Sequence, residues 1–150
     1  MIKPNITIAM ASDHGGFEMK EFIKRKLEQE GVTIVDFGTN SEESVDYPDF
    51  IHPLAKAIND GKYSIGIIMC GSGNGAQITA NKYINVRAGL CWNVEQAKLT
   101  RLHNNANILS LPGRFVSMAD AWEITSMFLE TDFEGGRHTQ RVEKISQILK

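Results

Sequence analysis

Short apolar runs alternate with longer amphipathic stretches along the whole chain, and this alternation constrains the fold more than any other feature. The apolar runs cover residues 6–11, 32–37, 65–69, 86–90 and 106–111. The first run is rich in β-branched residues and too short for a helix, which is typical of a strand. Strands that alternate with helices form parallel sheets with right-handed crossovers. We therefore expect residues 1–150 to form one domain, a three-layer α/β/α sandwich on a five-stranded parallel sheet with a Rossmann-like arrangement.

The intervals between the runs predict helices, because apolar residues recur there every three or four positions or follow a capping residue. Asn93 and Ser117 are the predicted caps. The five predicted helices cover residues 19–27, 51–58, 75–83, 93–102 and 117–129.

The C-terminal segment departs from this pattern. After the glycine pair at 135–136, Val142, Ile145 and Leu149 place one apolar stripe on a short terminal helix. A helix added after the sheet is complete packs either on its own domain or on a partner subunit. We expect the partner, which predicts a homodimer or a tetramer built from dimers.

The composition excludes several classes of function. The chain has 16 Lys and Arg against 18 Asp and Glu, so its formal net charge is −2 and no basic surface for nucleic acid or anionic membrane is expected. No apolar stretch approaches the roughly 20 residues of a membrane span, and the N-terminus does not resemble a signal peptide. Cys70 and Cys91 form neither a disulfide framework nor a zinc-binding pattern. These features predict a soluble cytoplasmic protein.

Three polar clusters directly follow predicted strands, at residues 12–16, 70–75 and 113–114. Ligands bind parallel α/β sheets beyond the carboxyl ends of the strands, so these clusters are expected to lie together. In the second cluster, alternate glycines let several N–H groups converge at a helix start, which favours a phosphate or an oxyanion. Ala76 stands where a Walker loop needs lysine and a cysteine phosphatase needs arginine, and the glycine spacing does not fit a dinucleotide loop.

Each candidate side chain also has a simpler structural explanation. Cys70 is either a buried structural thiol or a thiolate stabilised by the helix start and the loop amides, whereas Cys91 is expected in the core. Asp13 is either a functional carboxylate or a helix cap, and His103 is either a functional imidazole or a cation at a helix C-terminus. Arg137 and Arg141 lie one helical turn apart, so they either bind one common target or form a solvent-exposed face of the helix. His52 is expected at the surface or in packing.

Together, these residues resemble the type B ribose-5-phosphate isomerase family, which also contains galactose-6-phosphate and allose-6-phosphate isomerases. The likeness covers nearly the whole chain and depends on the order and spacing of its segments. Those segments are residues 13–17, 46–48, 70–75, 80–82, 87–88, 103–104, 107 and 135–141.

The resemblance implies a cofactor-free and metal-free aldose–ketose isomerase of the pentose phosphate pathway, with ribose 5-phosphate as substrate. It implies that Cys70 moves a proton between C1 and C2 through an enediolate and that Ser72 helps the proton pass between the two oxygens. His103 would open the sugar ring with help from Asp13. Because Ala76 follows the glycine run, where other members of the family place an acid, this chain resembles the cysteine type.

The resemblance also implies the residues that bind substrate. The loop amides would hold the enediolate charge, and His14, Arg137 and Arg141 would bind the phosphate. Asn104 and Arg114 would contribute binding contacts, and Tyr47 would line the sugar. These residues are His14, Tyr47, Gly71, Gly73, Asn74, Gly75, Asn104, Arg114, Arg137 and Arg141.

The predicted helix before His103 runs antiparallel to the strands, so it should end at the sheet edge away from Cys70. Either that helix is tilted, or His103 completes the site of a partner subunit; we expect the second. Three other functions remain open: a six-carbon sugar-phosphate isomerase, a non-catalytic sugar-phosphate-binding protein and a nucleotide-binding domain.

Overall fold

The five predicted strands form one parallel sheet in the computed structural model, which describes residues 1–149. The strands are β1 (Thr7–Ser12), β2 (Thr33–Asp36), β3 (Gly66–Cys70), β4 (Ala88–Leu90) and β5 (Ile108–Pro112). Their spatial order is β2-β1-β3-β5-β4, and every neighbouring pair is parallel. β3 and β5 are buried along their whole length, which explains why their sequences are almost continuously apolar.

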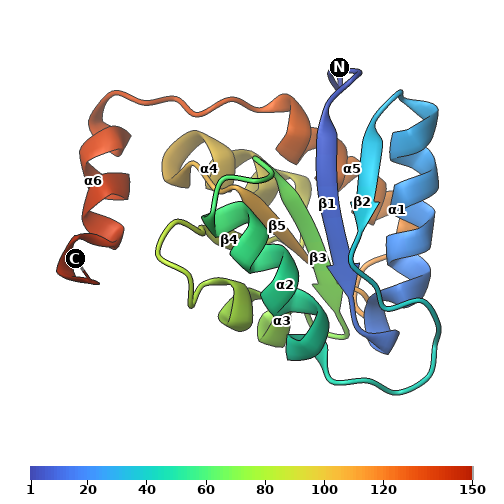
Figure 1. Ribbon diagram of the computed structural model, residues 1–150. Coiled ribbons are helices and arrows are strands. Elements are labelled where there is room, and N and C mark those ends of the chain that lie inside the picture. Colours follow the sequence, from blue (N-terminus) through green and yellow to red (C-terminus); the bar gives the residue numbers. More distant parts are fainter. Residues whose placement is uncertain (150) are drawn as a thin grey trace.

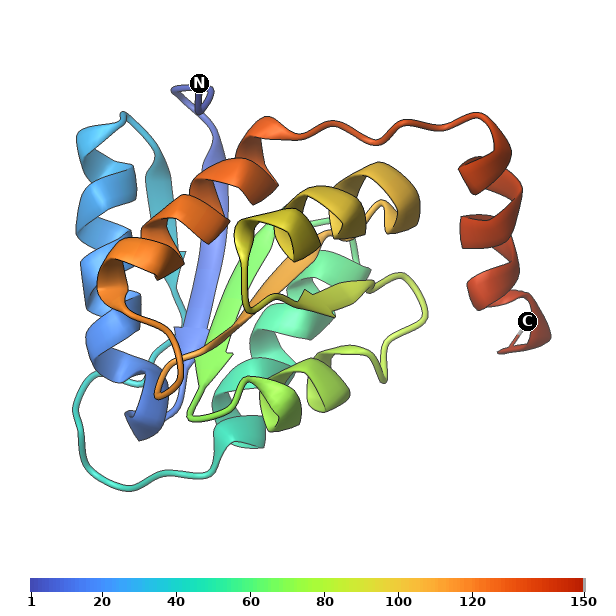
Figure 2. The same ribbon diagram turned by 180° about the vertical axis from the view of Figure 1, so that it is seen from behind.

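Helices cover both faces of this sheet. Figure 2 shows α1 (Phe17–Gln29), α4 (Val94–Asn104) and α5 (Met118–Glu130) on one face, and Figure 1 shows α2 (Tyr47–Asn59) and α3 (Asn74–Ala80) on the other. Alternate strand residues supply the two cores: Ile8 and Met10 pack toward α1 and α5, whereas Ala9 and Ala11 pack toward α2 and α3. The predicted α/β/α sandwich is confirmed.

Local hydrogen bonds explain where the elements begin and end. The predicted caps are confirmed: Asn93 Oδ1 accepts from the N–H of Gln96 at 2.8 Å, and Ser117 Oγ accepts from the N–H of Asp120 at 3.0 Å. The prediction placed the fourth strand at residues 86–90, but β4 begins at Ala88. The reason is that a side-chain oxygen, not a neighbouring strand, accepts the N–H of residue 87 at 2.8 Å.

α4 also extends two residues beyond the predicted end, so His103 and Asn104 belong to its last turn. Asn105 ends this helix in the left-handed region, at φ +47°. The helix predicted over residues 75–83 is shorter in the structure, because α3 ends at Ala80. The next side chain, Asn81, instead bonds the backbone N–H and carbonyl of Ala88.

The C-terminal segment lies outside the three layers. Residues 131–136, here called the strap, lead from α5 to α6 (Arg137–Ile145) and a 3-10 turn (Gln147–Leu149), and Figures 1 and 2 show α6 standing away from the sheet. In α6 the buried residue is His138, while Ile145 is 56 % exposed and Ile148 beyond it is 91 % exposed. The apolar stripe of α6 is therefore only partly covered by its own chain, since Val142 is half-buried and Ile145 is exposed. The side chain of Leu149, the predicted third member, lies outside the described part.

Within residues 1–149, the helices are too short or too polar to cross a membrane.

Candidate functional site

The three predicted clusters meet at the carboxyl ends of β1, β3 and β5. The N–H of Gly113 donates to the carbonyl of Cys70 at 2.9 Å, and the N–H of Arg114 donates to the carbonyl of Gly71 at 2.9 Å. A Cβ on Gly113 would lie 2.8 Å from the carbonyl oxygen of Gly15, so only glycine lets these loops touch. Two neighbouring strands, β1 and β3, diverge into loops here, which is the place where parallel sheets bind ligands.

In the loop of residues 71–75, the carbonyls of Gly71 and Gly73 are bonded to the rest of the fold. Arg114 N–H binds the carbonyl of Gly71, and Ser110 Oγ donates to the carbonyl of Gly73 at 2.8 Å. Across residues 1–149, no protein group accepts from the N–H of Gly71, Ser72 or Gly73. Backbone N–H groups without a protein acceptor stabilise negative charge, as the sequence predicts for this loop.

Ser110 was not predicted as part of the site. It is fully buried in β5, and its hydroxyl holds Gly73 in place from below the loop. Gly73 has φ +77° and caps α3, a conformation that a residue with a side chain adopts at a cost. The sequence does contain a signal for this role: Ser110 is the one polar residue in the otherwise apolar run 108–111.

The two cysteines are both buried but have different neighbours. Cys70 is 4 % exposed and ends β3 exactly where the loop with free N–H groups begins. Cys91 is 1 % exposed in the core between the sheet and α4, as predicted. Burial raises the pKa of the Cys91 thiol to about 12, so Cys91 stays protonated at neutral pH.

Asp13 and His14 lie beside this loop. Asp13 is buried and its Oδ1 accepts from the N–H of Gly16 at 3.2 Å, so it has the capping role that the sequence left open. His14 Nδ1 accepts from the backbone N–H of Val45 at 3.1 Å. Since Nδ1 is an acceptor, the proton of the neutral ring is on Nε2, which makes His14 a hydrogen-bond donor.

Three further predicted residues surround the loop. The ring of Tyr47 covers Gly75 so closely that a Cβ there would be 2.5 Å from the ring. The side chain of Arg114 crosses the first glycine of the loop, with Nη1 at 3.3 Å from the position of a Cβ. Ser72 Oγ accepts from the N–H of Asn74 at 3.2 Å. A cation, a phenol and a hydroxyl thus border the free amides.

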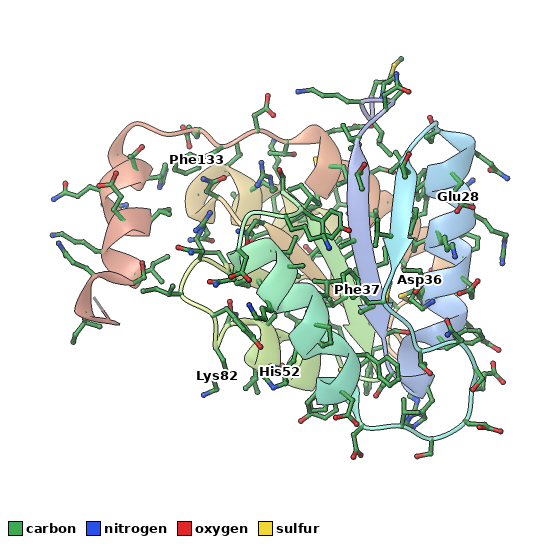
Figure 3. The ribbon with its side chains drawn as sticks, viewed as in Figure 1. Glu28, Asp36, Phe37, His52, Lys82 and Phe133 are labelled. Carbon is green, nitrogen blue, oxygen red and sulfur yellow. The ribbon has the colours of Figure 1, made fainter. Side chains whose placement is uncertain are left out.

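A buried ion pair supports the end of β1. The Lys20 side chain, on α1, is 0 % exposed, and its Nζ lies 2.7 Å from Asp36 Oδ2. Figure 3 labels Asp36 at the end of β2. Asp36 Oδ1 accepts from Gly38 N–H, and the carbonyl of Gly38 accepts from Ser12 N–H, both at 2.8 Å. Burial is the largest single influence and raises the pKa of Asp36. The hydrogen bonds from Lys20, Gly38 and Lys24, together with the charge of Lys20, outweigh it, so this pKa lies below its ordinary value.

The remaining predicted residues form a second group around the strap and α6. The rings of His103 and His138 stack with centroids 4.3 Å apart, and Glu134 Oε2 lies 3.8 Å and 3.2 Å from their respective Nε2 atoms. Asn104 and Arg141 help to line a hollow of about 260 Å³ against these rings.

The two groups lie at opposite sides of the molecule. In Figures 1 and 2 the carboxyl ends of β1 and β3 are at the bottom, while the C-terminal end of α4 lies near the top, facing α6. The expected antiparallel course of α4 is therefore confirmed, and within one chain His103, Asn104, Arg137 and Arg141 do not join Cys70. His52, predicted at the surface or in packing, is exposed on α2 (Figure 3), and its Nδ1 lies 2.9 Å from Tyr83 Oη.

Comparison with known proteins identifies the family of the chain. Residues 8–145 match the family model described as Ribose/Galactose Isomerase. The chain is 41 % identical to ribose-5-phosphate isomerase B of Escherichia coli, over 94 % of this chain and 95 % of that protein.

Solved structures give the same result. The ribose 5-phosphate isomerase of Thermotoga maritima has a TM-score of 0.93 and 47 % identity, covering 95 % of this chain and 99 % of that one. Ribose-5-phosphate isomerase B of Mycoplasma genitalium, solved with bound ribulose 5-phosphate, has a TM-score of 0.93 and 37 % identity, covering 98 % of each chain. The chain thus belongs to the ribose/galactose isomerase family.

Proposed function

We propose that the protein is an aldose–ketose isomerase that interconverts ribose 5-phosphate and ribulose 5-phosphate in the pentose phosphate pathway. The observation that carries this proposal is the loop of residues 71–73, whose unpartnered amides lie next to Cys70. Isomerisation through an enediolate needs a base and a resting place for negative charge, and this loop offers both. The named relatives, and the neighbour solved with ribulose 5-phosphate, support the five-carbon substrate.

In this mechanism, the Cys70 thiolate removes the proton from C2 of the open-chain aldose, and the electron pair moves to the carbonyl oxygen. The enediolate charge is held by the N–H groups of Gly71 and Gly73, with Asn74 and Gly75 at the start of α3 adding to the field. Ser72 passes a proton between the two oxygens, and Cys70 returns its proton to C1. Atoms and electrons balance within the sugar, so no cofactor is required.

Ring opening and phosphate binding use the remaining residues. His103 donates the proton that opens the furanose, and Asp13 assists. His14 donates from Nε2 to the phosphate, which Arg137 and Arg141 also bind as charged donors. Asn104, Arg114 and Tyr47 make the other substrate contacts.

These roles require two chains. Since His103 and both arginines lie away from Cys70 in one chain, we infer a two-fold dimer in which α6 of one subunit reaches the carboxyl edge of its partner. The uncovered residues Ile145 and Ile148 support this, because an isologous interface would bury them twice. The two free thiols fit a reducing compartment, so we place this dimer in the cytoplasm.

The test is an assay with ribose 5-phosphate and allose 6-phosphate in parallel, in ordinary water and in deuterium oxide. We expect isomerisation of ribose 5-phosphate, with solvent deuterium at the exchanged carbon and a lower kcat/KM for the longer sugar. A preference for allose 6-phosphate would overturn the five-carbon assignment. Binding of either sugar without turnover or deuterium exchange would instead identify a non-catalytic sugar-phosphate-binding protein.

A further inference from the structure

The side chains of His103, Glu134 and His138 form a cluster for which the isomerase mechanism uses only His103. One potential ligand atom from each residue lies within 4.8 Å of the others. Imidazole nitrogen and carboxylate oxygen are the donors that zinc prefers besides thiolate. We propose that this cluster binds Zn²⁺, and that the bound ion inhibits the enzyme.

The two distances from Glu134 suit a tetrahedral ion, and binding requires the His103 ring to rotate, because it stacks on the His138 ring at an interplanar angle of 15°. Ligand atoms about 2.0 Å from Zn²⁺ are separated from one another by roughly 3.3 Å. Glu134 Oε2 already lies 3.2 Å from His138 Nε2 and 3.8 Å from His103 Nε2. The side chains of His103 and Glu134 are 40 % and 56 % exposed, so they can shift and rotate toward an ion. Three protein ligands leave a fourth position for water.

His138 supplies a second, independent indication of a ligand. Its side chain is only 7 % exposed, yet its Nε2 has no hydrogen-bond partner among residues 1–149, because the nearby Glu134 oxygen is not aligned for one. A buried polar atom without a partner costs free energy. Coordination to a metal ion would satisfy this nitrogen.

The backbone holds the three ligands in place. Glu134 N–H donates to the carbonyl of Leu102 at 3.2 Å, which fixes the strap beside the last turn of α4. Glu134 and His138 are four residues apart, and His138 N–H donates to the carbonyl of Gly135 at 3.0 Å. The C-terminal end of α4 carries partial negative charge, which favours a cation next to His103.

The inhibitory effect rests on the proposed function, whereas binding does not. A zinc ion on His103 removes the proton donor that opens the sugar ring. Because this cluster would face the partner's Cys70 in the inferred dimer, zinc and sugar phosphate would exclude each other. Inhibition is then competitive, raising the apparent KM for ribose 5-phosphate.

Binding is tested by calorimetric titration of the metal-free dimer with Zn²⁺. We expect one ion per chain, bound at least about tenfold more weakly by Glu134→Gln and by His138→Gln. Glu143→Gln on α6 and His52→Gln on α2 are matched controls with unchanged affinity. Co²⁺ as a second probe should show a visible spectrum that is lost in His138→Gln. Equal zinc affinity in all four variants, or the same Co²⁺ spectrum in His138→Gln as in the parent, would overturn the site.

Activity provides a separate readout. Glu134→Gln is expected to isomerise ribose 5-phosphate in metal-free buffer and to lose at least about tenfold in zinc sensitivity, and a chelator should restore the zinc-treated parent. Zinc that binds the cluster without slowing an active enzyme would overturn the inhibitory role. If the parent protein did not isomerise ribose 5-phosphate in metal-free buffer, the proposed function would be contradicted. The zinc titration would then still decide whether the cluster binds the ion.

Discussion

The two parts of the candidate site are built in opposite ways. The residues around Cys70 lie where three buried parallel strands end, and backbone hydrogen bonds connect their loops. The residues around His103 lie on a strap and a helix that touch the rest of the chain through α4 and leave apolar side chains exposed. In one chain the two parts lie apart, which is the basis of the dimer proposed above. Under that proposal the fold of one chain creates half of the site, and the partner subunit completes it.

Replacing each cysteine in turn should give the largest difference. Cys70→Ala is expected to lower kcat by about a thousandfold, because it removes the base from the rigid half. Cys91→Ala should keep kcat and lower the free energy of unfolding by about 1 kcal/mol, since Cys91 only fills the core. Steady-state kinetics and denaturant unfolding measure both effects. Equal kcat for the two variants would remove Cys70 from the mechanism.

On the projecting half, Arg141→Gln should raise the KM for ribose 5-phosphate by about 30-fold, because a charge-assisted contact to phosphate is lost. Arg141→Lys should raise the KM less, since lysine keeps the positive charge but lacks the planar guanidinium group that binds a phosphate through two N–H groups. Lys144→Gln, on the same helix, is the control for a lost charge. An unchanged KM in Arg141→Gln would show that α6 does not bind the phosphate.

A smaller effect is expected from Ser110→Ala, which removes one of the two hydrogen bonds to the carbonyl of Gly73 and leaves the one from the N–H of Gln77 at 3.1 Å. We expect about a tenfold loss in kcat with little change in KM, because the N–H groups that hold the enediolate lose alignment. Thr125→Val removes another buried hydroxyl, bonded to the carbonyl of Ala121 at 2.8 Å in α5. Both variants should lose about 1 kcal/mol of stability. A similar kcat in both would reduce Ser110 to a structural residue.

The smallest effect concerns the ion pair under β1. Because the pKa of Asp36 is lower in the folded protein, its carboxylate stabilises the fold at neutral pH, and this contribution disappears as the pH falls through the folded pKa. Asp36→Asn should therefore be less stable than the parent at pH 7, and the gap should close below about pH 4. Unfolding by urea across this range measures the gap. A gap independent of pH would contradict the charge-based explanation.

Local patterns in the sequence were sufficient for the fold and for the residues at the carboxyl edge. Apolar runs and caps predict five strands and five helices, and the strand ends place Asp13, Cys70 and Arg114 together. Because α4 runs antiparallel to the strands, the sequence also predicts that His103 lies at the opposite edge of the sheet from Cys70. Such inferences work because each depends on residues close together in the chain.

What could not be predicted depends on contacts between distant segments. Val45 fixes the tautomer of His14 from a loop 31 residues away, and Ser110 holds Gly73 from 37 residues away. The stacking of His103 on His138 depends on how the strap folds back over α4. No periodicity or motif encodes these distances, so they require coordinates.

The most direct test of the shared site mixes two inactive proteins, Cys70→Ala and His103→Ala, and lets their subunits exchange. Half of the resulting dimers should be mixed, and each should contain one intact site, so about a quarter of the parental activity should return. Mass spectrometry would confirm that mixed dimers have formed. Activity that stays at the level of the separate variants, despite verified exchange, would show that each chain builds its site alone.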